Sequence, residues 1–146
     1  EDEVVEETGA VSVARHTVVD DVGRMDNPML VKGQIHGGIV QGLAQGLYED
    51  LTYEPTTGQL LAGSFMDYAM PRADDMPAFD VDSHEVPTAV NPLGAKGVGE
   101  AGTVGALPAL LNAVNDALAP LGVRHLDMPV TAEGVWRAIQ DAKAGR

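Results

Sequence analysis

Glycine recurs at every fourth position of one segment, at Gly38, Gly42 and Gly46. The apolar residues around these glycines fall at spacings of three and four, which predicts a helix over residues 39–51. A glycine costs about 1 kcal/mol relative to alanine inside a helix, so three glycines in one helix call for a compensating contact. Because they leave a bare stripe, that contact is either a second backbone or a ligand lying very close. For the stripe taken alone, tight packing against another helix or a sheet is the favoured explanation.

A second glycine-rich segment lies some sixty residues further on, with five glycines between Gly94 and Gly105, directly ahead of another predicted helix. Successive glycines let backbone N–H groups converge on an anion, and a helix N-terminus adds about half a positive charge. Gly97, Gly99 and Gly102 match the dinucleotide-binding pattern G-x-G-x-x-G, but that pattern belongs directly after a buried strand. Here prolines and an asparagine precede it, so the sequence argues against a nicotinamide-binding Rossmann domain.

The remaining residues predict short strands, turns and two further helices. The expected strands are residues 4–5, 11–19, 60–68 and 79–84, the expected turns or loops are Thr8-Gly9, Asn27-Pro28 and 56–58, and the further helices are 103–118 and 132–143. Pro108 is tolerable only near the first turn of its helix, and Thr131 is suited to cap the last one. We therefore predict one α+β unit of short strands and hairpins with two or three helices, in which Phe65 and Trp136 belong to the core.

Composition excludes several classes of protein. Nine basic residues against 22 acidic ones give a net charge of −13, so no nucleic-acid partner is expected, because phosphate binding needs a basic face. The chain has no cysteine, which removes disulfides, thiolate metal sites and Fe–S ligation. No apolar run approaches 18 residues and the acidic start cannot serve as a signal peptide, so we expect a cytoplasmic protein. The four histidines show no ligand spacing, and none is assigned to a metal.

Two polar residues stand beside the glycine-rich segments. Gln34 lies just ahead of the first predicted helix, where an amide can hydrogen-bond an oxo group or a pterin edge without adding charge, although glutamine is also common in loops. Glu100 lies at the mouth of the second helix. An acid there is either a partner of the helix dipole, worth about 0.3–1 kcal/mol, or a carboxylate held rigidly beside a ligand, as a general base must be. Spacing alone does not choose between these two roles.

The two segments together resemble a known family. Residues 34–38 (Gln-Ile-His-Gly-Gly) with Gln41-Gly42, followed by residues 94–103 (Gly-Ala-Lys-Gly-Val-Gly-Glu-Ala-Gly-Thr), are similar to the molybdenum-binding large subunit of a group of hydroxylases. That family includes xanthine dehydrogenase, aldehyde oxidoreductase and CO dehydrogenase. The flanks agree, in residues 19–24 (Val-Asp-Asp-Val-Gly-Arg) and 67–71 (Asp-Tyr-Ala-Met-Pro). The resemblance covers nearly the whole chain, from about Gly9 onward.

The resemblance implies a site and a cofactor. Glu100 falls on the family's glutamate, which takes a proton from a metal-bound hydroxyl while that oxygen attacks an electrophilic carbon of CO, an aldehyde or an N-heterocycle. The implied cofactor is molybdopterin with molybdenum, in the cytosine dinucleotide form common in bacteria. His36 replaces an acidic residue of some xanthine-type members, which favours the CO dehydrogenase-like branch. The residues of this chain on which cofactor contacts fall are Gln34, near the metal end, Gly37, Gly38, Lys96, Gly97, Val98 and Gly99.

A whole subunit of this family is several times longer than this chain, so the resemblance identifies residues 1–146 as the C-terminal portion of a cofactor-binding domain. Its implied partners are the upstream part of the same subunit, an Fe–S subunit and an FAD subunit, in an oligomeric assembly. The other cofactor loops, and the loop that holds copper in CO dehydrogenase, lie upstream, so the isolated fragment is expected to be inactive. The alternative is a structural or assembly module, in which the glycines serve packing and Glu100 is only a helix-end acid.

Overall fold

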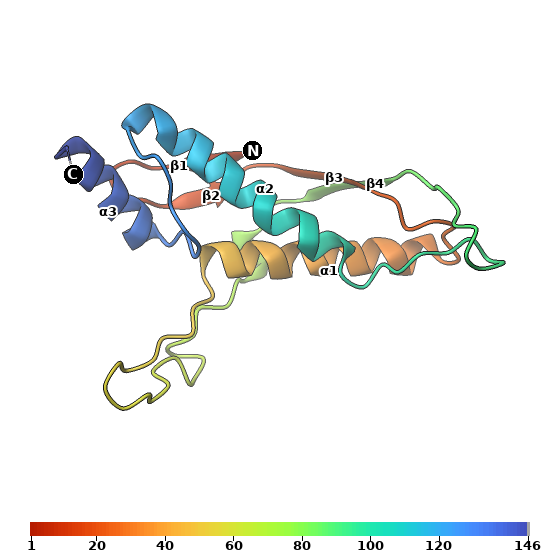
Figure 1. Cartoon of the computed structure of the whole chain (residues 1–146), viewed down its shortest axis with the longest axis horizontal. Helices are drawn as coiled ribbons and strands as arrows, with labels where there is room; N and C mark the ends of the chain where they lie inside the picture. The colour runs from red at the N-terminus through yellow and green to blue at the C-terminus, as the bar shows by residue number, and fades with distance from the viewer. Residues whose placement is uncertain (146) are drawn as a thin grey trace.

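The computed structural model describes residues 1–145 and has two long helices lying side by side, with short strands along them and a third helix at one end (Figure 1). Contacts between α1 and α2 form the centre of the molecule, and β1, β3 and β4 pack against these two helices. The α+β class predicted from the sequence is therefore confirmed. The elements are β1 (Asp2–Val4), β2 (Val11–Val13), β3 (His16–Asp20), α1 (Pro28–Leu47), η1 (Ala73–Asp75), β4 (Phe79–Ser83), α2 (Ala101–Leu118), η2 (Ala119–Leu121) and α3 (Ala132–Lys143).

Helix α1 begins at Pro28 and ends at Leu47, so the predicted range 39–51 is wrong at both ends. Asn27 and Pro28, expected to form a loop, instead start the helix. The Asn27 side chain accepts a hydrogen bond from the Leu30 N–H at 3.2 Å, and Pro28 occupies a first-turn position, where its missing N–H costs nothing. As a consequence, Gln34 lies inside α1 and not ahead of it.

The glycine stripe of α1 faces α2. A Cβ atom added to Gly38 would lie 3.0 Å from the Thr103 backbone nitrogen, and one added to Gly42 would lie 2.9 Å from the Thr103 carbonyl oxygen. The contact is reciprocal, because a Cβ on Gly102 of α2 would come 2.3 Å from the Ile35 carbonyl oxygen. The two backbones touch where no side chain fits, and tight helix packing accounts for this stripe.

Apolar side chains on either side of this contact form the core. They come from all three helices, and at most 2% of each residue is exposed: Ile35, Ile39 and Leu43 of α1, Leu110, Val114 and Leu118 of α2, and Val135 and Ile139 of α3. Helix α3 has the bounds predicted from the sequence, and the Thr131 hydroxyl caps it by accepting from the Gly134 N–H at 3.2 Å. Burial of these faces supplies the main stabilisation of the fold.

The strands form two separate pairs. Strands β1 and β2 make an antiparallel hairpin closed by the predicted turn, where Gly9 takes a φ of 70°. The single strand predicted over 11–19 is interrupted at Ala14-Arg15, so that β2 pairs with β1 while β3 pairs in parallel with β4. The predicted strand at 79–84 matches β4 to within one residue. The switch of partner after Ala14 depends on β4, which lies far along the chain.

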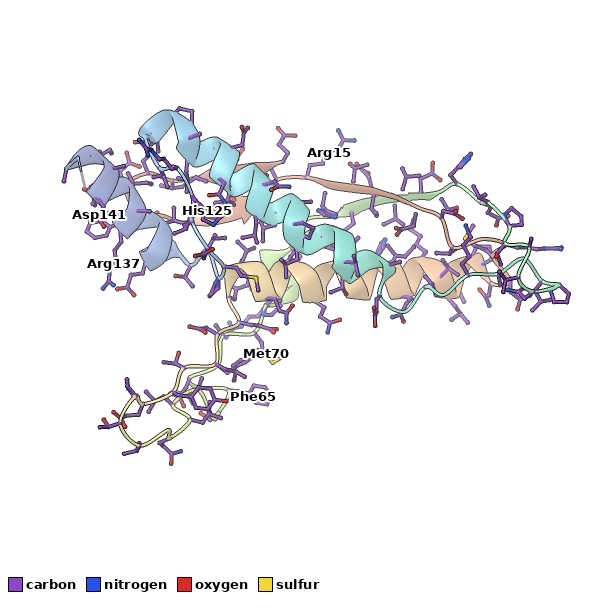
Figure 2. The ribbon with its side chains drawn as sticks, viewed as in Figure 1. Arg15, Phe65, Met70, His125, Arg137 and Asp141 are labelled. Carbon is purple, nitrogen blue, oxygen red and sulfur yellow. The ribbon has the colours of Figure 1, made fainter. Side chains whose placement is uncertain are left out.

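An arm formed by residues 49–72 extends away from the body below the end of α1 (Figure 1). The predicted turn at 56–58 is present and brings Tyr53 opposite Leu60, but the strand predicted over 60–68 does not form. Phe65, predicted to be in the core, is 87% exposed near the end of this arm (Figure 2), and Trp136 on α3 is 42% exposed. Both core assignments are wrong: Phe65 lies on the arm, and Trp136 lies outside the face of α3 that buries Val135 and Ile139.

Helix α2 departs from two expectations. Pro108 lies inside the helix and not in its first turn, so it removes one hydrogen bond of the helix. Residues 101–121 are also, alone among the helices of the described chain, long and apolar enough to cross a membrane, contrary to the expectation that no such stretch exists. Here α2 serves as a core helix, since the face bearing Leu110 and Val114 packs against α1.

The reciprocal glycine contact predicts that Gly42→Val destabilises the chain by about 1–3 kcal/mol, because the added side chain must push the α2 backbone away. Gly33→Val is the matched control, since Gly33 lies in the same helix with nothing within 4 Å of an added Cβ. Thermal unfolding of both variants checks this. Equal midpoints for the two variants would contradict the packing of α1 on α2 through the glycine stripe.

Candidate functional site

The loop of residues 94–99 is joined to the segment after β3 by backbone hydrogen bonds. The Lys96 N–H donates to the Val22 carbonyl at 2.9 Å, and the Arg24 N–H donates to the Gly94 carbonyl at 3.0 Å. Between them, Gly23 and Ala95 form an antiparallel bridge. The start of the loop is therefore attached to the body as a short extra strand would be.

A turn at Asn91 sets the entry to this loop. The Asn91 side chain donates to the Ala95 carbonyl at 2.9 Å and accepts from the Ala95 N–H at 3.3 Å. Gly94 has a φ of 70°, a conformation that side chains rarely adopt, and a Cβ there would lie 2.8 Å from the Pro87 Cβ. Glycine at this position is thus required by the turn and by close packing, independently of any ligand.

Asp21 ties three segments together. Its Oδ1 accepts hydrogen bonds from the Gly23 N–H at 2.9 Å and from the Val86 N–H at 3.0 Å, while Oδ2 pairs with the Lys96 Nζ at 2.5 Å. The hydrogen bond from Lys96, followed by those from the two backbone N–H groups, lowers the pKa of the Asp21 carboxyl from 3.8 to about 2. Because the pKa is lowered, the ionised Asp21 favours the folded state above pH 3.8, and this contribution is lost as the pH falls toward 2.

Gln34 joins the two glycine-rich segments. Its Nε2 donates to the Gly99 carbonyl at 2.9 Å, across 65 residues of sequence. The sequence predicted that Gln34 stands beside a ligand site, but it did not predict this bond, because it placed the residue outside the helix. One turn further along α1, Gly37 has nothing within 4 Å of an added Cβ, whereas Gly38 is buried against Thr103 of α2.

Beyond Lys96, the loop leaves its backbone free. Within residues 1–145, the N–H groups of Gly97, Val98 and Gly99 donate to no protein acceptor, and a Cβ added to either glycine would meet nothing within 4 Å. Glu100 follows directly as the N-cap residue of α2, and its exposed side chain caps none of the helix N–H groups. Three free donors next to an unengaged carboxylate can bind a polar or anionic group and exchange a proton with it.

An open cavity of about 450 Å³ lies between the first turns of α1 and this loop. Four of the predicted site residues line it together, namely Gln34, Lys96, Val98 and Gly99. Gly97 lies in the same loop, and Glu100 is the next residue after Gly99, whereas Gly37 and Gly38 are not among the lining residues. The rest of the lining comes mainly from the segment after β3 and the first turns of α1, and it includes Val22, Arg24, Leu30 and Val31.

Sequence reasoning gave no role to Asp21 or Arg24, although both belong to the Val-Asp-Asp-Val-Gly-Arg segment used for the resemblance. Their function depends on the bridge between Gly23 and Ala95, which local sequence does not reveal. In the part of the chain that the structure describes, no three histidine or acidic side chains are grouped so as to hold a metal ion.

Comparisons with known proteins identify the family of the chain. The family model of the molybdopterin cofactor-binding domain matches residues 1–77. The chain is 45% identical over 90% of its length to the nicotine 6-hydroxylase large subunit of Paenarthrobacter nicotinovorans, and 40% identical over 92% to the carbon monoxide dehydrogenase large chain of Hydrogenophaga pseudoflava. A crystal structure of Cu,Mo-CO dehydrogenase in its carbon monoxide-reduced state superimposes on 97% of the chain, with a TM-score of 0.93 and 36% identity.

The chain therefore belongs to the molybdopterin cofactor-binding family, with the molybdenum-binding large subunits of the xanthine dehydrogenase and CO dehydrogenase type. It spans 16% of the nicotine 6-hydroxylase subunit, 17% of the CO dehydrogenase large chain and 18% of the chain in the crystal structure. The resemblance stated from the two glycine-rich segments is confirmed at the level of the family.

The bond from Gln34 to Gly99 predicts that Gln34→Ala loosens the loop. Hydrogen exchange of the Ala101 and Val104 N–H groups, which donate to the Val98 and Glu100 carbonyls, should rise, and the chain should lose up to about 1 kcal/mol of stability. Gln45→Ala is the matched control, because Gln45 is exposed on the same helix, distant in sequence from the loop. Exchange rates that rise equally in the two variants would mean that the bond does not hold the loop.

Proposed function

We propose that this chain supplies one wall of the cofactor site of a molybdenum hydroxylase and that Glu100 is its catalytic base. The observation that carries the proposal is the position of Glu100, directly after the free N–H groups of residues 97–99, of which Val98 and Gly99 line the cavity. Its side chain has no capping role in α2. The carboxylate is therefore available to accept a proton from an oxygen nucleophile.

The residues present fit a molybdopterin-type group. Gly97 and Gly99 expose bare backbone, which lets a flat, polar cofactor approach closely, and Gln34 adds an uncharged amide at the same wall. The loop carries one ammonium group, that of Lys96, and the Asp21 carboxylate pairs with it. When bound, the cofactor supplies a molybdenum centre for two-electron oxidation. The chain's own residues would position the cofactor through backbone donors and hold a base beside its reactive end.

The substrate we propose is a small molecule with an electrophilic carbon: CO, an aldehyde or an N-heterocycle. The relatives support this range, since they include a nicotine hydroxylase, CO dehydrogenases and an aldehyde oxidoreductase. His36 adds nothing to the choice, because it rests edge-on against Phe79 at 5.8 Å and is not among the residues that line the cavity. The preference for the CO dehydrogenase-like branch therefore depends on sequence similarity.

We further propose the cytosine dinucleotide form of the cofactor and a cytoplasmic assembly with the rest of the subunit, an Fe–S subunit and an FAD subunit. The relatives support only the presence of further subunits, since they are named as large or molybdenum-binding subunits. The form of the cofactor, the nature of the partner subunits and the location follow from the resemblance stated from the sequence. Residues 1–146 offer a single wall of the cavity, so we expect neither firm cofactor binding nor turnover from this chain alone.

The alternative, a purely structural module, has one observation in its favour. Gly38, Gly42 and Gly102 are all explained by the packing of α1 on α2. That explanation does not extend to Gly97 and Gly99, around which an added Cβ meets nothing. The open glycines favour the cofactor role for the loop.

Glu100→Gln in the complete enzyme should retain molybdenum while turnover falls at least about a hundredfold, the lower end of what a general base contributes. Glutamine keeps the shape of the side chain and loses its basicity. The measurements are metal content and the rate of enzyme reduction by substrate. Glu133→Gln is the control, because Glu133 is also an exposed acid near the start of a helix, where it pairs with Arg137 of the same helix. A Glu100 variant within about threefold of the parent rate would remove Glu100 from this role.

A further inference from the structure

The cation of the loop is already neutralised within the chain. Lys96 Nζ pairs with Asp21 Oδ2, and the two side chains are 35% and 34% exposed. Of the two residues, Lys96 lines the cavity. Asp21 is itself held, because its other oxygen accepts from the Gly23 and Val86 N–H groups. The ammonium of Lys96 thus points at a fixed carboxylate that belongs to the protein.

We propose that Asp21 is a positioning residue for the cofactor loop, and that Lys96 serves the cofactor site through Asp21 and not by direct contact with an anionic group. This inference rests on the proposed function of the loop. It assigns the Asp21–Lys96 pair, defined here as the clasp, the task of fixing where the free N–H groups of residues 97–99 point.

The clasp is suited to this task by its place in the chain. The backbone bond from Lys96 to Val22 fixes the last anchored residue of the loop, and the next three residues have no protein partner for their N–H groups within residues 1–145. Without the side-chain pair, rotation about the Lys96 backbone would redirect those three donors together. The other end of the free stretch is held by Gln34 at Gly99, so the loop is fastened on both sides of its open donors.

A cycle of three variants tests the clasp in the complete enzyme that contains this chain. Asp21→Asn keeps an oxygen that can accept from Gly23 and Val86 while it loses the ion pair. Lys96→Gln removes the cation and leaves Asp21 in place, and the third variant combines both changes. The two readouts are hydrogen exchange through residues 95–99 and molybdenum-cofactor content after purification.

If Lys96 acts through Asp21, the single variants raise exchange by a similar factor, about two- to fivefold, and the double variant is no worse than either one. Cofactor content should fall by the same pattern, and Lys96→Arg should restore most of it, because arginine keeps the charge. Losses of cofactor that multiply in the double variant would show that Lys96 contacts the cofactor directly, and would overturn the inference. Unchanged cofactor content with raised exchange would overturn it as well, since the clasp would then be purely structural.

This test fails separately from that of the proposed function. If the Glu100→Gln variant keeps its turnover, Glu100 is not the base, but the results of the Asp21–Lys96 cycle can still be interpreted. If the losses of cofactor multiply in the double variant, the positioning role of the clasp is rejected, and the proposed role of Glu100 is unaffected.

Discussion

The backbone contact between α1 and α2 holds the start of α2, next to Glu100, against the part of α1 that carries Gln34. A Cβ on Gly102 would come 2.3 Å from the Ile35 carbonyl, so the two helices approach as closely as their backbones allow. Gly102 is two residues after Glu100, and Ile35 is the residue after Gln34. The contact therefore brings the start of α2 against the part of α1 around Ile35. The bond between Gln34 and Gly99 follows from it. A side chain at this crossing would separate the two halves of the site.

The site combines a rigid attachment with an unsatisfied stretch of backbone. Residues 94–96 are bonded to residues 22–24, while the next three N–H groups are left without a partner in the described chain. Free donors at a surface are readily hydrated, but here they border a cavity of about 450 Å³ and precede a helix that adds positive potential. The chain as a whole carries a charge of −13, so this loop is a local exception that suits a polar or anionic group. Because Asp21 neutralises Lys96, the backbone N–H groups are the principal hydrogen-bond donors that the loop offers to a ligand.

The parts of the fold that were predicted correctly depend on local chemistry. Thr131 caps α3, Gly9 and residues 56–58 form turns, and β4 has the alternation of a strand. The errors come from interactions with distant residues. Asn27-Pro28 is typical both of a turn and of a helix start, and packing of the later residues on α2 decides between them. Residues 60–68 have the composition of a strand, but their pairing is limited to the single bridge between Leu60 and Tyr53. In the site, the motifs pointed to Gln34, Glu100 and the loop as candidates, whereas Asp21 became a candidate only once the segment after β3 and the loop were seen to be joined.

A structure of the complete enzyme that contains this chain tests the central claim most directly, by showing what lies within hydrogen-bond distance of the N–H groups of residues 97–99. We predict that these groups donate to atoms of the molybdenum cofactor, with the Glu100 carboxylate facing its metal end. The account would be contradicted if polypeptide from elsewhere in the enzyme covered the loop and the cofactor lay away from it.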